Sequence, residues 1–337
     1  MNMIAFHRRS ARRHVQRGLT LIELMVGLTL GLVVTAALLL LFANASSNGQ
    51  NLARSSLQIE NGRYVSELLR EELGMAGFFG ETSMTAAAWS TPDPCSTAPT
   101  GWSGAPYTLP APVQGYAGGD VLACLTNRKP GTDAIAIRRV GSASVDPTTL
   151  SAANTQYYVQ YSFCIDDIAT PRLIFSPDKA LFTLRNRACT GANIVRPLVT
   201  RIYYVATCNR CNGDDTPTLK RVDLVGNQLV TTAIADGIDE LRLEYGFDTD
   251  GNGSTDTYRT TLGVAPDPTA SWANVMTVKA HFITRSLDKA TGGSALATAQ
   301  TFALGGIGTV TKASDGYTRR AYSSTIRLIN PSSAREN

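Results

Sequence analysis

The hydrophobic positions of this 337-residue chain form one dense block near the N-terminus, followed by a long region of short apolar runs. Residues 24–43 are apolar except for two threonines, and no charged residue lies between Glu23 and Arg54. About 20 residues of this kind cross a bilayer as a helix. The block therefore predicts that residues 19–45 form the transmembrane half of an N-terminal helix.

A helical pattern continues beyond this block. Apolar residues recur at spacings near three, four and seven, which places them on one stripe of a helix. The stripe consists of Leu52, Leu57, Tyr64, Val65, Leu68, Leu69 and Leu73. We predict one helix from about Leu19 to about Met75, ended by Gly74 and Gly77, with an amphipathic second half over residues 46–80. A helix lying on the membrane is the weaker alternative, because its polar face is not basic.

The remainder, residues 81–337, reads as one β-rich globular domain. Residues 81–119 and 287–318 are rich in small and turn-forming residues, and both stretches predict loops. Short runs with strand character lie between them: Ala134–Val140, Tyr157–Ile165, Leu173–Phe175, Leu181–Leu184, Arg201–Thr207, Leu219–Val225, Ile238–Phe247, Val275–Thr284 and Tyr322–Ile329. The predicted fold class is α+β, with a long N-terminal helix packed on a largely antiparallel β-sheet domain.

The charge balance changes along the chain. The whole sequence has 31 basic and 27 acidic residues, a net charge of +4. Five arginines and no acidic residue lie within residues 1–18, so the rest has 26 basic and 27 acidic residues, a net charge of −1. That remainder has no basic field for nucleic acid, and we predict no direct nucleic-acid binding. The arginines favour retention of the N-terminus in the cytoplasm.

The string RGLTLIEL, from Arg17 to Leu24, follows this basic segment. It resembles the signal of type IV prepilins. The resemblance implies cleavage by prepilin peptidase between Gly18 and Leu19, methylation of the new N-terminus, and pairing of Glu23 with the amine of a neighbouring subunit during filament assembly. A charge at the mouth of an apolar run is costly unless it is paired. An ordinary secretory signal, cut near Ala43-Asn44-Ala45, is the weaker alternative because the apolar run is too long.

Three further strings resemble PilW-like minor pilins. They are ENGRYVSELLREELGMAGFFG at residues 60–80, DGIDELRLEYGFDTDGNGSTD at residues 236–256, and RRAYSSTIRLIN at residues 319–330. The resemblance covers both ends of the chain and one interior segment. Residues 82–235 have a pattern typical of strands and loops, and no string within them resembles a known family.

All six cysteines follow the apolar block, which favours disulfides formed in the periplasm. Cys208-Asn-Arg-Cys211 precedes a loop, and the sequence has no second CxxC motif. A local disulfide that closes the turn, which we call a turn clip, is therefore favoured over a redox pair or a zinc site. Six cysteines allow 15 connectivities. Short loops favour the sequential pairs Cys95–Cys124, Cys164–Cys189 and Cys208–Cys211.

The histidines argue against an enzyme. His7 and His14 leave with the leader peptide, so the processed chain keeps His281 alone, in an alternating strand pattern. The sequence contains no recognisable Ser–His–Asp set, zinc-type histidine pair or phosphate loop. We therefore expect no catalysis and no required cofactor.

One acidic segment has the spacing of a calcium loop. Oxygen-bearing side chains occur at positions 1, 3, 5 and 9, and a backbone carbonyl serves position 7. These positions are Asp248, Asp250, Asn252, Asp256 and, for the carbonyl, Ser254. Position 12, where a bidentate glutamate belongs, is Arg259, so only weak binding is expected. A polar hairpin turn uses the same residue types and remains an alternative.

The resemblance implies a minor pilin that joins other minor pilins and the major pilin and primes pilus assembly near the tip. Its expected partners are prepilin peptidase, the inner-membrane assembly machinery and a tip adhesin. The expected location is a single pass of the inner membrane, with the C-terminal domain in the periplasm, and then the pilus on the cell surface. The pilus would serve twitching, adhesion or DNA uptake.

Two alternatives remain. A minor pseudopilin of a type II secretion system would have the same signal and a similar build. A membrane-tethered calcium-binding adhesin would never enter a filament.

Overall fold

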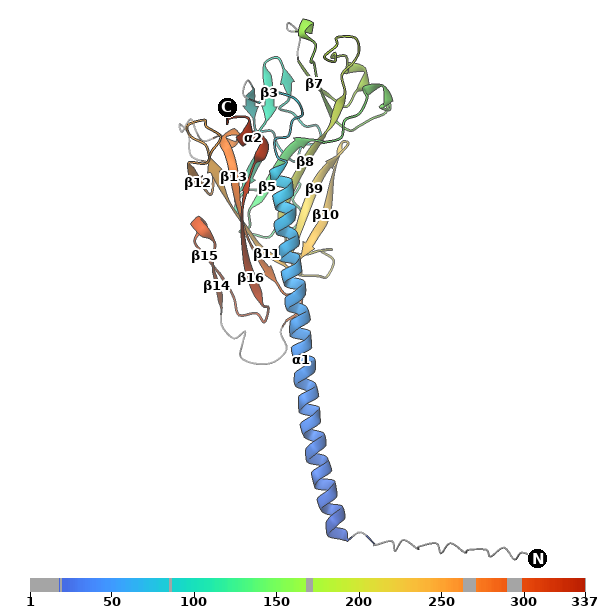
Figure 1. Cartoon of the computed structure of the whole chain (residues 1–337), viewed down its shortest axis with the longest axis vertical. Helices are drawn as coiled ribbons and strands as arrows, with labels where there is room; N and C mark the ends of the chain where they lie inside the picture. The colour runs from blue at the N-terminus through green and yellow to red at the C-terminus, as the bar shows by residue number, and fades with distance from the viewer. Residues whose placement is uncertain are drawn as a thin grey trace, which may run out of the picture. The chain divides into compact units, whose positions relative to one another are not determined.

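A computed structural model describes residue 18 and residues 20–84, 87–167, 172–262, 271–289 and 299–336 (Figure 1). Two compact units are present, Met1–Ala53 and Arg54–Asn337. The fold is α+β, with one long apolar N-terminal helix and a largely antiparallel β-sheet domain, which confirms the predicted class.

The long helix α1 covers Leu21–Gly74. Its end agrees with the predicted one: Gly77 adopts a left-handed φ of +72°, and its N–H donates to the carbonyl of Arg138. A left-handed residue just past a helix terminates it, and glycine adopts that conformation without strain. No proline interrupts the 54 residues, which allows one continuous helix.

The first sheet is antiparallel, with the strand order β10-β9-β8-β5-β4 (Figure 1). Strand β6 also pairs with β8, and β7 pairs with β6. The strands are β4 (Val113–Tyr116), β5 (Ala134–Val140), β6 (Tyr158–Tyr161), β7 (Leu173–Ser176), β8 (Val195–Ala206), β9 (Thr218–Val225) and β10 (Gln228–Asp236).

The second sheet has the order β12-β11-β13-β16, with every pair antiparallel. Its strands are β11 (Ile238–Phe247), β12 (Thr257–Arg259), β13 (Val275–Arg285) and β16 (Arg319–Arg327). In β11 the side chains of Leu241, Leu243 and Tyr245 enter the core, and the adjacent Glu240 and Glu244 are also buried.

Smaller elements complete the described fold. Strands β1 (Ala88–Ser90), β2 (Ser103–Gly104) and β3 (Tyr107–Pro110) form a three-stranded sheet, and β14 (Gln300–Ala303) pairs with β15 (Thr309–Lys312). A second helix, α2, covers Ile329–Ser333. The single-turn helices are η1 (Pro147–Thr149), η2 (Ile165–Asp167), η3 (Lys179–Leu181), η4 (Trp272–Asn274) and η6 (Gly305–Ile307).

The largest core lies between the C-terminal part of α1 and the two large sheets. Val65, Leu69 and Leu73 of the helix are fully or almost fully buried there. Glu72 of α1 forms an ion pair with Arg201 of β8, and the Gln58 amide donates to the carbonyl of Thr284 at 2.9 Å. Val65, Leu68, Leu69 and Leu73 of the predicted stripe thus pack on the sheets, whereas Leu57 and Tyr64 are exposed.

Three predictions of local structure were wrong, and strands β10 and β12 were not predicted. Residues 81–119 contain strands β1 to β4, and the second predicted loop contains β14 and β15. Residues 181–184 form no strand, because η3 ends at Leu181. Strand β10 was missed, because its Thr-Thr-Ala centre lacks a hydrophobic alternation.

Candidate functional site

The predicted processing segment lies at the start of the described chain. Gly18 is exposed, whereas Leu19, His7, His14 and the leader arginines lie outside the described residues. The N–H and the hydroxyl of Thr20 each donate to Glu23 Oε2 at 3.1 Å. The N–H of Glu23 donates back to Thr20 Oγ1 at 3.3 Å. This reciprocal pair is a capping box, and it satisfies N–H groups that a helix start leaves free.

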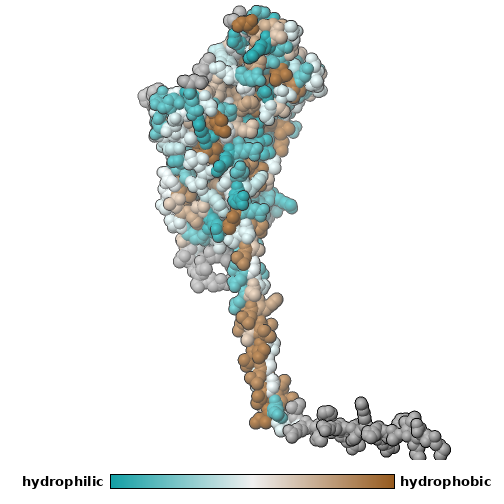
Figure 2. Space-filling model, in the orientation of Figure 1, coloured by the Kyte–Doolittle hydropathy of each residue, from teal (hydrophilic) through white to brown (hydrophobic). Residues whose placement is uncertain are grey.

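The first half of α1 meets the requirements of a membrane span. By length and composition the helix is able to cross a bilayer, and its most apolar window is entirely unburied within the structure. Figure 2 shows hydrophobic residues covering this part of the helix. The hydroxyls of Thr29 and Thr35 donate to helix carbonyls three or four residues earlier, so neither hydroxyl is unsatisfied in lipid.

The acidic turn between β11 and β12 brings three carboxylates together. Oxygen atoms of Asp248, Asp250 and Asp256 lie within 4.8 Å of one another. Asn252 Oδ1 accepts from the N–H of Ser254 at 2.7 Å, so it already has a partner inside the turn. Carboxylate oxygens are of the type that a hard cation binds.

A guanidinium already contacts one of these carboxylates. Arg335 Nη1 donates to Asp248 Oδ2 at 3.0 Å, and the other Asp248 oxygen accepts from the N–H of Gly251 at 2.7 Å. Burial alone would raise the pKa of Asp248, but the N–H of Gly253 and the Arg335 guanidinium lower it below its usual value. The turn therefore holds the C-terminal end of the chain, and a cation would compete with Arg335.

The cysteines are joined as Cys95–Cys124, Cys164–Cys189 and Cys208–Cys211. These are the same three pairs that the sequential assignment predicts. The last pair closes a four-residue turn after β8, as a turn clip requires.

His281 belongs to a polar chain that the sequence does not reveal. Its Nε2 lies 2.8 Å from Glu244 Oε1, and its Nδ1 lies 2.8 Å from Ser323 Oγ. The three residues stand side by side on β11, β13 and β16, separated by 37 and 42 positions in the sequence. The N–H of Gly306 in η6 also donates to Glu244 Oε1, at 3.0 Å. The chain thus attaches the turn between β14 and β15 to the second sheet.

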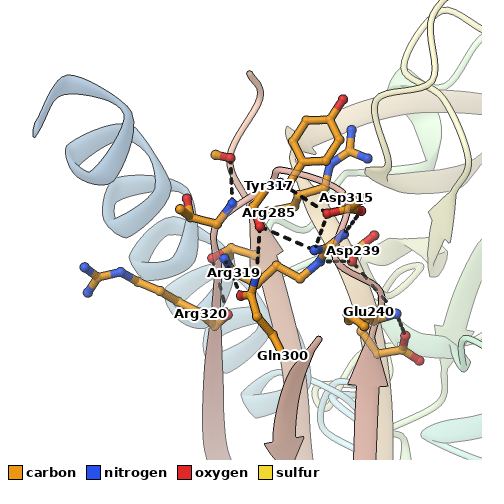
Figure 3. Close-up of polar contacts among 12 residues, drawn as sticks. Asp239, Glu240, Arg285, Gln300, Asp315, Tyr317, Arg319 and Arg320 are labelled. Carbon is orange, nitrogen blue, oxygen red and sulfur yellow. Dashed lines mark hydrogen bonds and ion pairs between the residues drawn. The ribbon is translucent and has the colours of Figure 1, made fainter. Parts of the chain in front are cut away.

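A second polar cluster lies at the other end of this sheet (Figure 3). Asp239 receives ion pairs from Lys129 and from Arg319, the latter at 2.8 Å. Burial alone would raise the pKa of Asp239, but Lys129 and Arg319 lower it below its usual value. Arg319 also donates to Asp315 at 2.8 Å, and this bond holds the pKa of Asp315 at about 2.

Sequence reasoning missed both clusters because their members come from different strands.

Comparison with known families gives two matches. Residues 202–330 match the model of the type IV pilus-assembly protein W family, and residues 13–39 match the prokaryotic N-terminal methylation motif. The first match includes the strings at 236–256 and 319–330, and the second includes Gly18, Leu19 and Glu23. The first match also covers residues 202–235, where the sequence alone suggested no family, and neither match includes the string at 60–80. No curated protein and no solved structure matches the chain.

The methylation motif includes the capped start of an exposed apolar helix. The PilW match contains the second sheet, and from the first sheet it contains β9, β10 and the last residues of β8. The chain is therefore a membrane-anchored, PilW-like type IV pilin.

Proposed function

We propose that this pilin is a minor subunit that is cut between Gly18 and Leu19 and then primes pilus assembly near the tip. The observation that carries the proposal is the methylation motif on a helix whose first half is apolar and unburied and whose second half lies in the core of a PilW-like domain. Such a helix leaves the bilayer only if other subunits cover its apolar surface. The proposed role is structural, without catalysis or a required cofactor.

The proposal includes an orientation and a set of partners. The arginine-rich leader favours a cytoplasmic N-terminus, and the disulfides favour a periplasmic domain. Prepilin peptidase, the inner-membrane assembly machinery, other minor pilins, the major pilin and a tip adhesin are the proposed partners. Twitching, attachment or DNA uptake would then depend on the chain through the pilus.

Mass spectrometry of the N-terminal peptide, on protein recovered from sheared surface filaments, tests this proposal. We expect a chain that begins at a methylated Leu19. A chain beginning at Ser46, or its absence from the filaments, would contradict it. The tethered adhesin predicts an unprocessed N-terminus and no protein in filaments.

The pseudopilin alternative needs a different experiment. A deletion strain is compared with its parent for twitching and for type II protein secretion. We expect loss of twitching with normal secretion. The opposite result would assign the chain to the secretion system.

We also propose weak calcium binding at the acidic turn, supported by the proximity of Asp248, Asp250 and Asp256. Because Arg335 contacts Asp248, Arg335→Gln should tighten binding, measured by calcium titration calorimetry on the full chain in detergent. Asp250→Ala is the matched loss-of-ligand control. Absence of calcium binding in both the wild type and Arg335→Gln at millimolar calcium would reject the site.

A further inference from the structure

Strand β10 leaves one side of the first sheet open. It is the terminal strand in the order β10-β9-β8-β5-β4, and no other described strand pairs with its outer side (Figure 1). A free edge offers a row of backbone donors and acceptors to a second chain. Folded proteins usually block such edges with charges, prolines or shortness.

This edge has none of those blocks over most of its length. From Gln228 to Ala235 the strand contains no charged residue and no proline. The other terminal strands are short, as in β4 with four residues and β12 with three, or basic, as in β16, where Arg319, Arg320 and Arg327 lie near the ends. Strand β10 is therefore the described edge that is both long and uncharged.

The hairpin register shows which backbone groups point outward. Val225 and Gln228 pair across a two-residue turn, and residues that flank such a turn exchange hydrogen bonds. Alternate pairs along the ladder do the same, so Val230 and Thr232 bond to β9. The N–H and C=O groups of the residues between them face outward: those of Leu229, Thr231 and Ala233.

The side chains along this edge define the chemistry of a matching strand. Val230 is 43% exposed, and Thr231, Thr232 and Ala233 are also exposed. Cross-strand neighbours of such residues are favourable when they are β-branched or aromatic. An incoming strand with uncharged, β-branched or small residues would pair with the edge without burying a charge.

We propose that β10 is an assembly edge, which receives an extended, uncharged strand from a different protein of the pilus tip. The proposal rests on the proposed function as a minor pilin. A second copy is a poorer occupant. Two identical edges pair antiparallel about a twofold axis, which would reverse the direction of residues 54–74 in one copy, whereas subunits anchored by their N-termini in one membrane share a direction.

Substitutions at Thr231 test the edge in full-length protein in cells. Thr231→Pro removes an outward N–H while leaving the bonds to β9 intact, and Thr231→Lys adds a charge at the same place. Thr231→Val is the matched control, because it keeps the backbone donor. We expect at least a tenfold loss of Thr231→Pro and Thr231→Lys from sheared filaments, and wild-type amounts of Thr231→Val.

Two further measurements keep the outcomes distinct. Membrane levels and thermal unfolding of each variant show whether it folds, and a photo-crosslinker at position 231 reports the occupant. A crosslink from position 231 to a different pilus protein supports the proposal. With the crosslinker moved to a neighbouring position, Thr231→Lys should abolish that crosslink. A crosslinked dimer of this chain overturns the proposal. Wild-type recovery of folded Thr231→Pro and Thr231→Lys also overturns it. If the wild-type chain is itself absent from filaments, the proposed function fails instead.

Discussion

Single residues in this pilin often have one role that the sequence suggests and a second that only the contacts show. Glu23 is the clearest case, because the resemblance to prepilins implies a pairing role between subunits, while the structure places it in a capping box with Thr20. The two roles differ in what they need. Capping needs a hydrogen-bond acceptor, whereas pairing with an amine needs a negative charge.

Substitution of Glu23 separates these roles. Glu23→Ala removes both, and Glu23→Gln keeps an acceptor that suits a capping box. We expect both variants to be cleaved nearly normally and both to be depleted from filaments about equally, measured by immunoblotting of processed protein and of sheared filaments. Normal filament incorporation of Glu23→Gln would show that the cap, and not the charge, is what assembly requires. Normal pilus numbers in Glu23→Ala would reject both roles.

Asp315 gives a prediction for the dependence of stability on pH. Its hydrogen bond from Arg319 lowers its pKa to about 2, below the value near 3.9 of an unfolded chain. Its contribution to stability is therefore present above about pH 4 and disappears as the pH falls through about 2. Asp315→Asn should lower the melting temperature at pH 7 and reduce the fall in stability between pH 4 and 2, measured by circular dichroism. An unchanged acid slope would contradict this assignment.

At the scale of elements, the contact between α1 and β16 depends on a glycine. A Cβ at Gly62 would lie 2.2 Å from Cζ of Tyr322, whose ring stacks on Phe282 with centroids 5.1 Å apart. A side chain at position 62 would therefore overlap the Tyr322 ring unless that ring moved. This close approach fixes where the helix lies on the second sheet.

Replacing this glycine tests the contact. Gly62→Ala should destabilise the protein by about 1–3 kcal/mol, because overpacking displaces the Tyr322 ring. Gly49→Ala is the matched control, since nothing lies within 4 Å of its Cβ and alanine favours a helix by about 1 kcal/mol over glycine. The measurement is thermal unfolding of the full chain in detergent. Equal effects of the two substitutions would show that Gly62 is not a packing position.

The elements that the sequence predicts correctly are those with strong periodicity. The helix ends within one residue of its predicted end at Met75, and β5 and β11 match their predicted ranges. Long runs of regularly spaced apolar residues are compatible with only one type of secondary structure. Strand β10 and the strands within residues 81–119 lack such runs, and their pairing partners fix them. The chain through Glu244, His281 and Ser323 was not predictable, because strand order brings it together.

At the scale of the whole molecule, the described hydrophobic residues separate into four clusters instead of one core. The smallest contains Leu150, Phe182 and Val195, and it lies in the region that also carries Cys164–Cys189. A small cluster supplies little burial, so this region depends on its disulfide.

The double variant Cys164→Ser, Cys189→Ser should therefore unfold locally. We expect faster proteolysis within residues 145–195, with the two flanking fragments remaining protected, one of which holds α1 and the other the second sheet. Cys208→Ser with Cys211→Ser is the control, because that pair closes a turn of only four residues. Limited proteolysis followed by peptide mass spectrometry distinguishes the two, and equal cleavage patterns would contradict the local role.

The contact between Gly62 and Tyr322 also determines how late in synthesis the fold is completed. Its two sides are 260 positions apart, so α1 meets Tyr322 only after nearly the entire chain has been synthesised. Contacts this distant in sequence form slowly, since the intervening loop must be closed first. Until then this contact is absent, whereas Val65, Leu69 and Leu73 of α1 share their core with residues of strands that come earlier in the chain, such as Val113, Ile135 and Tyr203. The close contact at Gly62 is therefore among the last that a growing chain is able to form.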